Sequence, residues 1–563
     1  MRKLPTILIF ALLMFFIGAF FIWPLSDVFV NSVRDDEGWT FRYLWDLVAN
    51  KIQLSSISYT LLIACWVTFL CLVICVPLGF LFARYTFPGQ SVMGILLLLP
   101  MILPPFVGAV GMKTILARAG PLSTLLMKLG LVDGPVDWLG MYPLAGIVIL
   151  EALHLFPIMY LNLTSSFANV DPSLEESARN LGASPLKVFS KITFPLAMPG
   201  VFAGATLIFI WSFTELGTPL VFGFRNVLPV KIYDNVSEIG SNPIGYAQVV
   251  FLLLVTVLGF WLSKKFLRGK KDVATLGKLS VSSGGKKLKL PYVFLVWFLV
   301  GSLVFFAILP HISVILISLH RKWFLTIFPQ GFTLDFFGKA ISMDLTRKSM
   351  INSLSLASIA SFIDILLGFA IAWLCVRKKI KGADLLDSLA MLPLAVPGLV
   401  IAFGYMGCFS RTFPGTFLDP RTNPMFLLTM AYAMRRLPYM TRACHAGLEQ
   451  INKSYEEAAL NMGASPFKVI KRITIPLIGA NILAGTILCF SFSMLEVSDS
   501  LILAQTEKFY PLTKAIYTLM NSLENGVNIS SALGVWAMCL LGSALILVSC
   551  LLGKSLGQVF RSG

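Results

Sequence analysis

The stretch from Glu175 to Gly200 reads EESARNLGASPLKVFSKITFPLAMPG, and it returns from Glu456 to Asn481 as EEAALNMGASPFKVIKRITIPLIGAN. Of the 26 aligned positions 14 are identical, at a constant offset of 281 residues, so the chain is an internal duplication. A charged residue costs about 2.5 to 3.5 kcal/mol at the centre of a membrane-spanning helix. Both copies of this polar stretch are therefore expected to lie outside any bilayer that the rest of the chain crosses.

The first part of each copy is predicted to be a short amphipathic helix. Ser173 stands three residues before Glu176, and Ser454 three residues before Glu457, which is the spacing of a capping box. Apolar and polar residues then alternate at helical spacing. The apolar face comprises Leu174, Ala178 and Leu181, and the polar face Glu175, Arg179 and Asn180.

A glycine turn and a second helix are expected to follow. Gly182 and Gly463 can leave the right-handed helix at little cost. The dipeptides 184–185 and 465–466 are both Ser-Pro, which supplies an N-cap and a proline at the first helical position. The motif is therefore helix, turn, helix.

The residue order in both copies resembles the cytoplasmic "EAA" loop of permease subunits of bacterial ATP-binding-cassette importers. The likeness rests on Glu-Glu-Ser/Ala-Ala, then Gly-Ala-Ser-Pro, an apolar run and Ile-Thr-x-Pro-Leu. It implies that each loop is a coupling helix seated in a cleft of a separate ATPase subunit, a helix-in-groove contact. The alternative is a helix that lies on the lipid headgroups. The coupling residues implied by the resemblance are Glu175, Glu176, Ala178, Gly182 and Pro185, and Glu456, Glu457, Ala459, Gly463 and Pro466.

Composition indicates a polytopic membrane protein. The 563 residues are 57% hydrophobic and 13% charged, the mean hydropathy is +0.81, and several apolar runs exceed the roughly 20 residues that cross a bilayer. In a soluble protein a net charge of +17 would suggest nucleic acid as a partner. Here Lys and Arg gather in short loops beside apolar runs, so the positive charge indicates how the chain is oriented in the membrane. The expected partner is the lipid bilayer.

The predicted fold is all-α, with about twelve transmembrane helices in two homologous six-helix halves. Residues 1–263 form the first half, 264–290 a basic cytoplasmic linker, and 291–563 the second half. The first apolar run is too long for a secretory signal, so it is expected to be a retained span. This topology places both coupling loops, the linker and both termini in the cytoplasm. The spans are predicted at 4–30, 55–83, 94–112, 143–167, 195–222, 247–262, 291–319, 349–376, 385–409, 425–447, 476–504 and 530–553.

The third span of each half is rich in proline and glycine. Pro104 lies within the first of these spans, and Pro397 within the second. Such interruptions are tolerated where other helices or water satisfy the freed backbone groups. Paired broken spans point to the translocation path of a transporter. The alternative is an ordinary kinked span that faces lipid.

Glu215 and Glu496 are ionisable residues inside apolar spans, related by the same offset of 281. Glu215 lies 20 residues after Pro195, which is about 30 Å along a helix. Both glutamates should therefore lie toward the outer end of the fifth span of each half. The hypothesis is an outer gate that contacts substrate or a docked binding protein. The alternative is an acid bonded to neighbouring backbone or lysine.

Arg435 and Arg436 are adjacent arginines deep in the fourth span of the second half, and Glu151 lies at the corresponding depth in the first. Guanidinium groups suit an anionic ligand. The favoured alternative is that Glu151 pairs with one arginine across the pseudo-twofold axis as a structural lock, because an unpaired buried charge is expensive.

No enzyme is expected within this chain. Residues 553–555, Gly-Lys-Ser, lack the upstream glycine of a phosphate loop, since Val548 stands in its place, and no catalytic or metal-binding constellation is found. The expectation is a transport subunit that binds no cofactor or metal, while a partner subunit hydrolyses ATP.

The sequence Arg-Arg-Leu-Pro-Tyr at 435–439 looks most like fused permeases of the ferric-iron and thiamine group. This resemblance implies alternating access in a bacterial inner membrane, with an ATPase subunit as a homodimer and an extracytoplasmic solute-binding protein as partners. Ferric iron is the expected cargo. The alternatives are thiamine, phosphonate, sugar phosphate or polyamine, and, in another class, a secondary transporter driven by an ion gradient.

Overall fold

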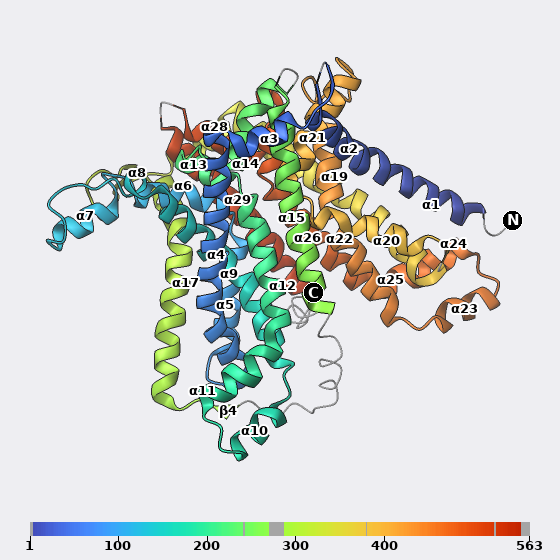
Figure 1. The fold of residues 1–563 in the computed structure, drawn as a ribbon, viewed down its shortest axis with the longest axis horizontal. Helices are drawn as coiled ribbons and strands as arrows, with labels where there is room; N and C mark the ends of the chain where they lie inside the picture. The colour runs from blue at the N-terminus through green and yellow to red at the C-terminus, as the bar shows by residue number, and fades with distance from the viewer. Residues whose placement is uncertain are drawn as a thin grey trace.

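The computed structural model describes residues 4–35, 37–239, 242–268, 286–378, 380–522 and 525–552. These form a bundle of long helices in which the polar helices α10 and α23 lie far from α13, α14 and α28 (Figure 1). Most of the predicted linker, residues 269–285, lies outside the described residues. The predicted all-α class is confirmed.

Strands in the described residues are short pairs at the ends of helices. Two pairs are antiparallel, β1 (Arg34–Asp35) with β2 (Gly38–Trp39) and β5 (His320–Lys322) with β6 (Gln330–Phe332). One pair is parallel, β3 (Tyr85–Thr86) with β4 (Lys286–Lys287).

The long helices follow the same order in both halves, while α7 and α8 have no counterpart between α21 and α22. The first half contains α1 (Leu4–Ile17), η1 (Gly18–Ile22), α2 (Trp23–Ser32), α3 (Arg42–Ala49), α4 (Lys51–Arg84), α5 (Gln90–Ile102), α6 (Pro105–Ile115), α7 (Pro121–Lys128), α8 (Trp138–Met141), α9 (Pro143–Ala168), α10 (Pro172–Asn180), α11 (Pro185–Val188), η2 (Phe189–Thr193), α12 (Phe194–Phe213), α13 (Gly217–Phe222), α14 (Leu228–Asp234), η3 (Asn235–Glu238) and α15 (Ile244–Arg268). The second contains α17 (Leu290–Ser318), α18 (Asp335–Ser342), α19 (Asp344–Trp373), η5 (Leu374–Lys378), α20 (Ala383–Met391), η6 (Leu392–Leu394), α21 (Gly398–Thr412), α22 (Met425–Gln450), α23 (Ser454–Asn461), α24 (Pro466–Val469), η7 (Ile470–Thr474), α25 (Ile475–Leu477), α26 (Gly479–Met494), α27 (Ser498–Leu503), η8 (Glu507–Phe509), α28 (Leu512–Met520) and α29 (Gly526–Leu552).

Eight helices of the described residues are long and apolar enough to cross a membrane, or eleven if each of three bent pairs is one span. Two of the bent pairs are the proline-rich third spans, α5 with α6 at 86° and α20–η6 with α21 at 100°. α22 occupies the remaining place in the predicted order and carries Arg435 and Arg436. The predicted breaks in the third spans are confirmed at Pro104 and Pro397, each of which precedes the second helix of its pair.

The broken third spans receive helices from the opposite half, which interlocks the two halves. α17 packs on α5 and α6, and α2 packs on α21. A Cβ placed at Gly111 of α6 would lie 1.9 Å from the Pro310 carbonyl oxygen, and one placed at Gly404 of α21 would lie 3.2 Å from that of Pro24. These glycines therefore permit the close helix crossings, and each half has such a glycine in its third span.

Gly111→Val should prevent this crossing, because its side chain would enter the space of the Pro310 carbonyl. Overpacking of this kind costs about 1–3 kcal/mol or more. The expected result is a lower melting temperature and less monodisperse protein in detergent. Gly301→Val, on α17 with no atom within 4 Å of its added Cβ, is the matched control. Equal stability of the two variants would contradict the assigned crossing.

Candidate functional site

Each coupling loop has the predicted helix, turn and helix. Gly182 and Gly463 adopt left-handed conformations, with φ of +84° and +85°. Ser184 accepts a hydrogen bond at 3.4 Å from the Lys187 backbone N–H, and Pro185 begins α11. Ser465 and Pro466 repeat this arrangement at α24. The predicted turn and second N-cap are confirmed in both copies.

The predicted capping boxes are wrong. Asp171 is the N-cap of α10 and accepts a hydrogen bond at 2.9 Å from the Ser173 backbone N–H. Pro172, with its fixed φ, begins the helix before Ser173 can act as a cap. In the second copy Asn452 accepts from the Ser454 backbone N–H at 3.1 Å, and Ser454 is itself the first helical residue.

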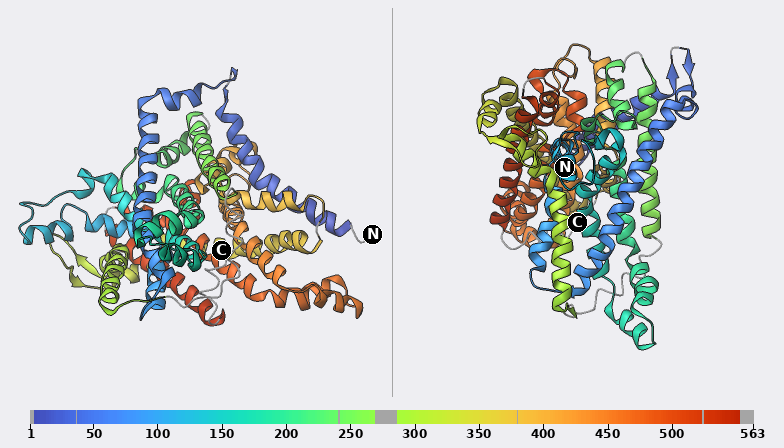
Figure 2. Two further views of the ribbon diagram at one scale, coloured as in Figure 1. Left: turned by 60° about the horizontal axis from the view of Figure 1, so that its bottom comes forward. Right: turned by 90° about the vertical axis from the view of Figure 1, so that its left-hand side faces the viewer.

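Large apolar side chains of both loops are exposed, whereas Ala459, Val188 and Val469 are buried. Leu181 is 90% exposed, and Met462, its repeat equivalent, is 81% exposed. The other exposed apolar side chains are Leu174, Leu186, Tyr455, Leu460 and Phe467, and together with Leu181 and Met462 they form what we call the coupling face. The loops lie at separate corners of the molecule (Figure 1), and Figure 2 shows the first loop extending beyond the helical bundle. An exposed apolar surface of this kind is typical of a docking site.

Glu175 lies on the opposite, inner face of α10. It binds Arg84, the last residue of α4, at 2.7 Å, and accepts a hydrogen bond at 3.0 Å from the Thr193 hydroxyl. The Arg84 guanidinium also donates to the Val170 carbonyl at 2.8 Å. We call this arrangement the loop clamp. The predicted polar face is therefore not uniformly outward, since Glu175 is buried while Glu176 is exposed.

The loop clamp is repeated in the second half. Arg377 binds Glu456 at 3.1 Å, and Thr474 donates to Glu456 at 2.9 Å. Arg377 also donates to the Ile451 carbonyl at 3.2 Å. Sequence reasoning missed Arg84 and Arg377, although each directly follows the predicted second span of its half, 55–83 or 349–376. Each coupling loop is thus tied to the second span of its half.

Glu175→Gln should loosen the first coupling loop, because it leaves Arg84 without its carboxylate partner. Removing one partner of a buried ion pair costs about 3 kcal/mol or more. Faster amide hydrogen exchange across residues 170–193 is expected, whereas Glu176→Gln, the exposed neighbour, should leave exchange unchanged. Exchange at the same rate in both variants would show that the loop clamp does not hold the loop.

Both fifth spans break where the predicted glutamates lie. Glu215 follows the end of α12 and accepts backbone hydrogen bonds from Gly217 and Thr218 at 3.0 and 3.2 Å, so it caps α13. Glu496 occupies the same place between α26 and α27. The spans expected as continuous over 195–222 and 476–504 are therefore interrupted. A Cβ at Gly217 would lie 3.4 Å from Val497 Cγ1, so the two breaks adjoin at the boundary between the halves.

In the second half, two arginines and two acids form a compact group, the charge cluster. Arg436 binds Glu496 at 2.6 Å and donates to the Phe492 carbonyl at 2.7 Å. Arg435 pairs with Glu496 and, at 3.2 Å, with Asp499. With two charges of each sign, the cluster is formally neutral. Sequence reasoning missed Asp499, although in the continuous span predicted at 476–504 its position three residues after Glu496 would place both acids on one face.

The predicted lock between Glu151 and the arginines is wrong. The arginines form their ion pairs within their own half, because the fifth span that packs against them supplies both acids. Glu151 instead accepts a hydrogen bond from the Ser212 hydroxyl on α12. The arginines therefore do form buried ion pairs, as predicted, but their partners are Glu496 and Asp499 and not Glu151.

The two prolines of the third spans lie beside these polar groups. A Cβ at Gly398, directly after Pro397, would meet the Arg435 guanidinium at 2.1 Å. The Pro104 carbonyl lies 3.3 Å from His311 Nε2 on α17. The structure thus brings Pro397 to the charge cluster and Pro104 to the interlocking helix of the opposite half.

Lys514 joins the halves on the side away from the coupling loops. Its ammonium group donates to the Leu501 carbonyl at 3.0 Å and lies 3.3 Å from the Tyr233 hydroxyl of the first half. It also lies over the Tyr510 ring at 5.6 Å. Burial lowers the pKa of Lys514 to about 8. This contact between the halves therefore includes a desolvated amine.

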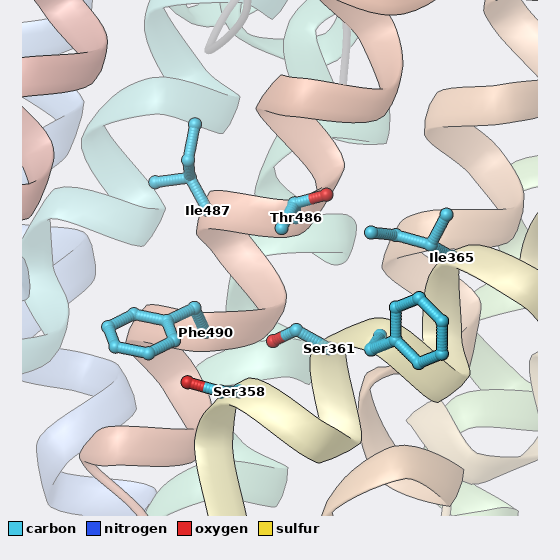
Figure 3. A pocket seen from close by; sticks show the side chains of 7 residues that line it. Ser358, Ser361, Ile365, Thr486, Ile487 and Phe490 are labelled. Atoms are coloured by element: carbon cyan, nitrogen blue, oxygen red, sulfur yellow. The ribbon is translucent and has the colours of Figure 1, made fainter. Parts of the chain in front are cut away.

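An apolar groove lies between α19 and α26 (Figure 3). It is lined by Ser358, Ser361, Phe362, Ile365, Thr486, Ile487 and Phe490. These residues include no charged group, so the groove offers an ion no strong ligand. Across the described residues, no group of three or more His, Cys, Asp or Glu is arranged to hold a metal.

Comparisons with known proteins agree with the duplication. The family model described as "Binding-protein-dependent transport system inner membrane component" matches twice, at residues 75–271 and 364–561. A ferric transport system permease of Actinobacillus pleuropneumoniae is 27% identical over 92% of this chain and 73% of its own length. An Fe(3+)-transport system permease of Haemophilus influenzae is 22% identical over 77% of this chain and 80% of its own length. A molybdenum transport system permease of the same organism is 28% identical over 40% of this chain and its whole length.

Proposed function

Because the chain belongs to the family of binding-protein-dependent transport system inner membrane components, we propose that it is the permease of an ATP-driven importer whose cargo is ferric iron. The family assignment makes it a multi-pass transport component of the inner membrane. Two family domains in one polypeptide supply both halves of a translocation path. We propose the linker at 264–290 as the division between them.

Energy coupling is assigned to the coupling face. It is apolar, exposed and duplicated, which are the properties needed to dock in two equivalent grooves of an ATPase homodimer. This single observation carries the proposal of an ATP-driven importer, since a carrier driven by an ion gradient has no use for such a surface. The coupling loops, the linker and both termini would then lie on the cytoplasmic side.

Ferric iron is proposed as the cargo because two relatives that align over most of this chain are named for ferric or Fe(3+) transport. The outer ends of the fifth spans, with Glu215 and Glu496, would form the gate toward an extracytoplasmic binding protein. The prolines at 104 and 397 and the arginines at 435 and 436 would line the path. The chain itself would bind no cofactor, and ATP would be hydrolysed by the partner.

The test is ATPase activity in proteoliposomes that contain this permease and its ATPase, with the binding protein added outside. The binding protein is supplied with ferric iron, thiamine, 2-aminoethylphosphonate, molybdate, a sugar phosphate or a polyamine. We expect ferric iron alone to stimulate hydrolysis and to accumulate inside. Stimulation by another cargo would replace the substrate assignment, and failure of any ATPase to bind the permease would overturn the importer assignment.

A further inference from the structure

The two repeat-related glutamates have different electrostatic environments. Glu496 is neutralised by Arg435 and Arg436. The residues that correspond to these arginines in the first half, 281 positions earlier, are His154 and Leu155. Glu215 therefore has no guanidinium partner in the described residues and receives backbone N–H groups instead. The duplication thus allows a comparison within one chain: the glutamate of the second half has two arginine partners, whereas the glutamate of the first half has none in the described residues.

Glu215 shares a small cavity with a second carboxyl group, that of Glu151. The cavity has room for roughly one water-sized occupant. Glu151 is 4% exposed, and its Oε1 has no hydrogen-bond partner, while Ser212 holds its other oxygen. The full lining is Thr60, Ile63, Glu151, Ser212, Glu215, Pro219, Val227 and Pro229. A carboxylate oxygen that lacks a hydrogen-bond partner and shares a small cavity with a second carboxyl group is neutralised by a proton or by a cation that occupies the cavity.

The donor atoms indicate the class of that occupant. The polar side chains of the cavity offer carboxylate and hydroxyl oxygens, with no sulfur or imidazole nitrogen. Such donors select hard cations. Two carboxylates are fewer than a resident metal centre commonly has, so binding should be weak. A weak site suits a translocation path, because the ion must leave as readily as it enters.

We propose that Glu151 and Glu215 form a transient binding site for a hard, multivalent cation on the translocation path of the first half. Ser212 fixes the orientation of Glu151, and the break between α12 and α13 places Glu215 at the boundary between the halves. The identification of this cation with the cargo rests on the proposed function. In the charge cluster of the second half, the guanidinium groups take the place next to the glutamate that the bound cation would take in the first half.

Binding is tested with Tb³⁺, a hard trivalent probe, added to the full permease in lipid nanodiscs, with luminescence sensitised by tryptophan such as Trp211 beside Ser212. Glu151→Gln and Glu215→Gln preserve side-chain shape and should each weaken Tb³⁺ binding by about tenfold or more. Glu449→Gln removes an exposed carboxylate of α22 and should leave binding unchanged. Ser212→Ala keeps both carboxylates and should give an intermediate loss, which serves as a second test if a glutamine variant does not fold. Identical binding by all four variants and the unaltered protein would overturn the site.

Ferric-iron uptake by the same proteins tests the cation site and the cargo assignment separately. If the unaltered protein imports ferric iron and both glutamine variants import it at the same rate, the site is overturned and the proposed function stands. If the unaltered protein imports no ferric iron while Tb³⁺ binding still depends on both glutamates, the cation site stands and the cargo assignment falls. Loss of both uptake and Tb³⁺ binding in folded glutamine variants supports both.

Discussion

Replacing Leu181 and Met462 together with aspartate should release the ATPase subunit from the permease. Both side chains are largely exposed at repeat-equivalent positions of the coupling face, so nothing within the chain should be disturbed. A central apolar contact typically contributes about 2 kcal/mol to an interface, and each loss should weaken association about thirtyfold. Introducing a carboxylate adds a desolvation penalty. Copurification and cargo-stimulated ATP hydrolysis should both be lost.

The matched control is Leu131→Asp. Leu131 is 68% exposed in the loop after α7, far along the chain from either coupling loop. It should leave ATPase association and stimulation intact. If the double variant retained full association while remaining folded, the coupling face would not be the docking surface, and a position against lipid headgroups would become the better account.

Arg436→Leu should strongly destabilise the protein, because Arg436 belongs to the buried charge cluster. It installs the residue found at the equivalent position of the first half, but it leaves Glu496 with Arg435 as its one remaining cation and frees the Phe492 carbonyl. Breaking a buried ion pair from one side costs about 3–5 kcal/mol. A melting temperature many degrees below that of the unaltered protein is expected in detergent.

A double variant shows whether the loss comes from uncompensated charge. Arg436→Leu combined with Glu496→Gln removes one charge of each sign and should recover part of the lost stability. Arg442→Gln, which breaks a half-exposed pair with Asp387, should cost little. If the double variant were no more stable than Arg436→Leu, packing rather than charge balance would explain the effect.

The sequence was sufficient for the fold because its signals were local or repeated. Glycine and Ser-Pro fixed the turns of the coupling loops, and Pro104 and Pro397 marked the broken spans. Where the structure differed, the deciding contact came from an adjacent residue in one case and from another helix in the other. Pro172 moved the start of α10, and the acids of the α26–α27 break satisfied the arginines that had been assigned to Glu151. Partners across helices cannot be read from spacing along one helix.

The site was predicted less completely than the fold. Glu215 and Glu496 were found because charge is rare in apolar spans, and the offset of 281 related them. Their differing environments depend on which side chains the packing brings near, so the sequence alone treated them as equivalent. The cavity beside Glu151 could not be predicted, because its walls come from α4, α9, α12, α13, α14 and the segments that precede α13 and α14.

α4 acts as a rod that is attached at both ends. Its last residue, Arg84, is held in the loop clamp, and 24 residues earlier Thr60 accepts a hydrogen bond at 2.8 Å from the Leu228 backbone N–H at the start of α14. α19 repeats this with Ser353 and the Leu512 backbone N–H at the start of α28, at 2.7 Å. A helix of 24 residues transmits displacement over about 36 Å. A displacement of the first coupling loop would thereby be carried along α4 toward Thr60, which also forms part of the cavity wall.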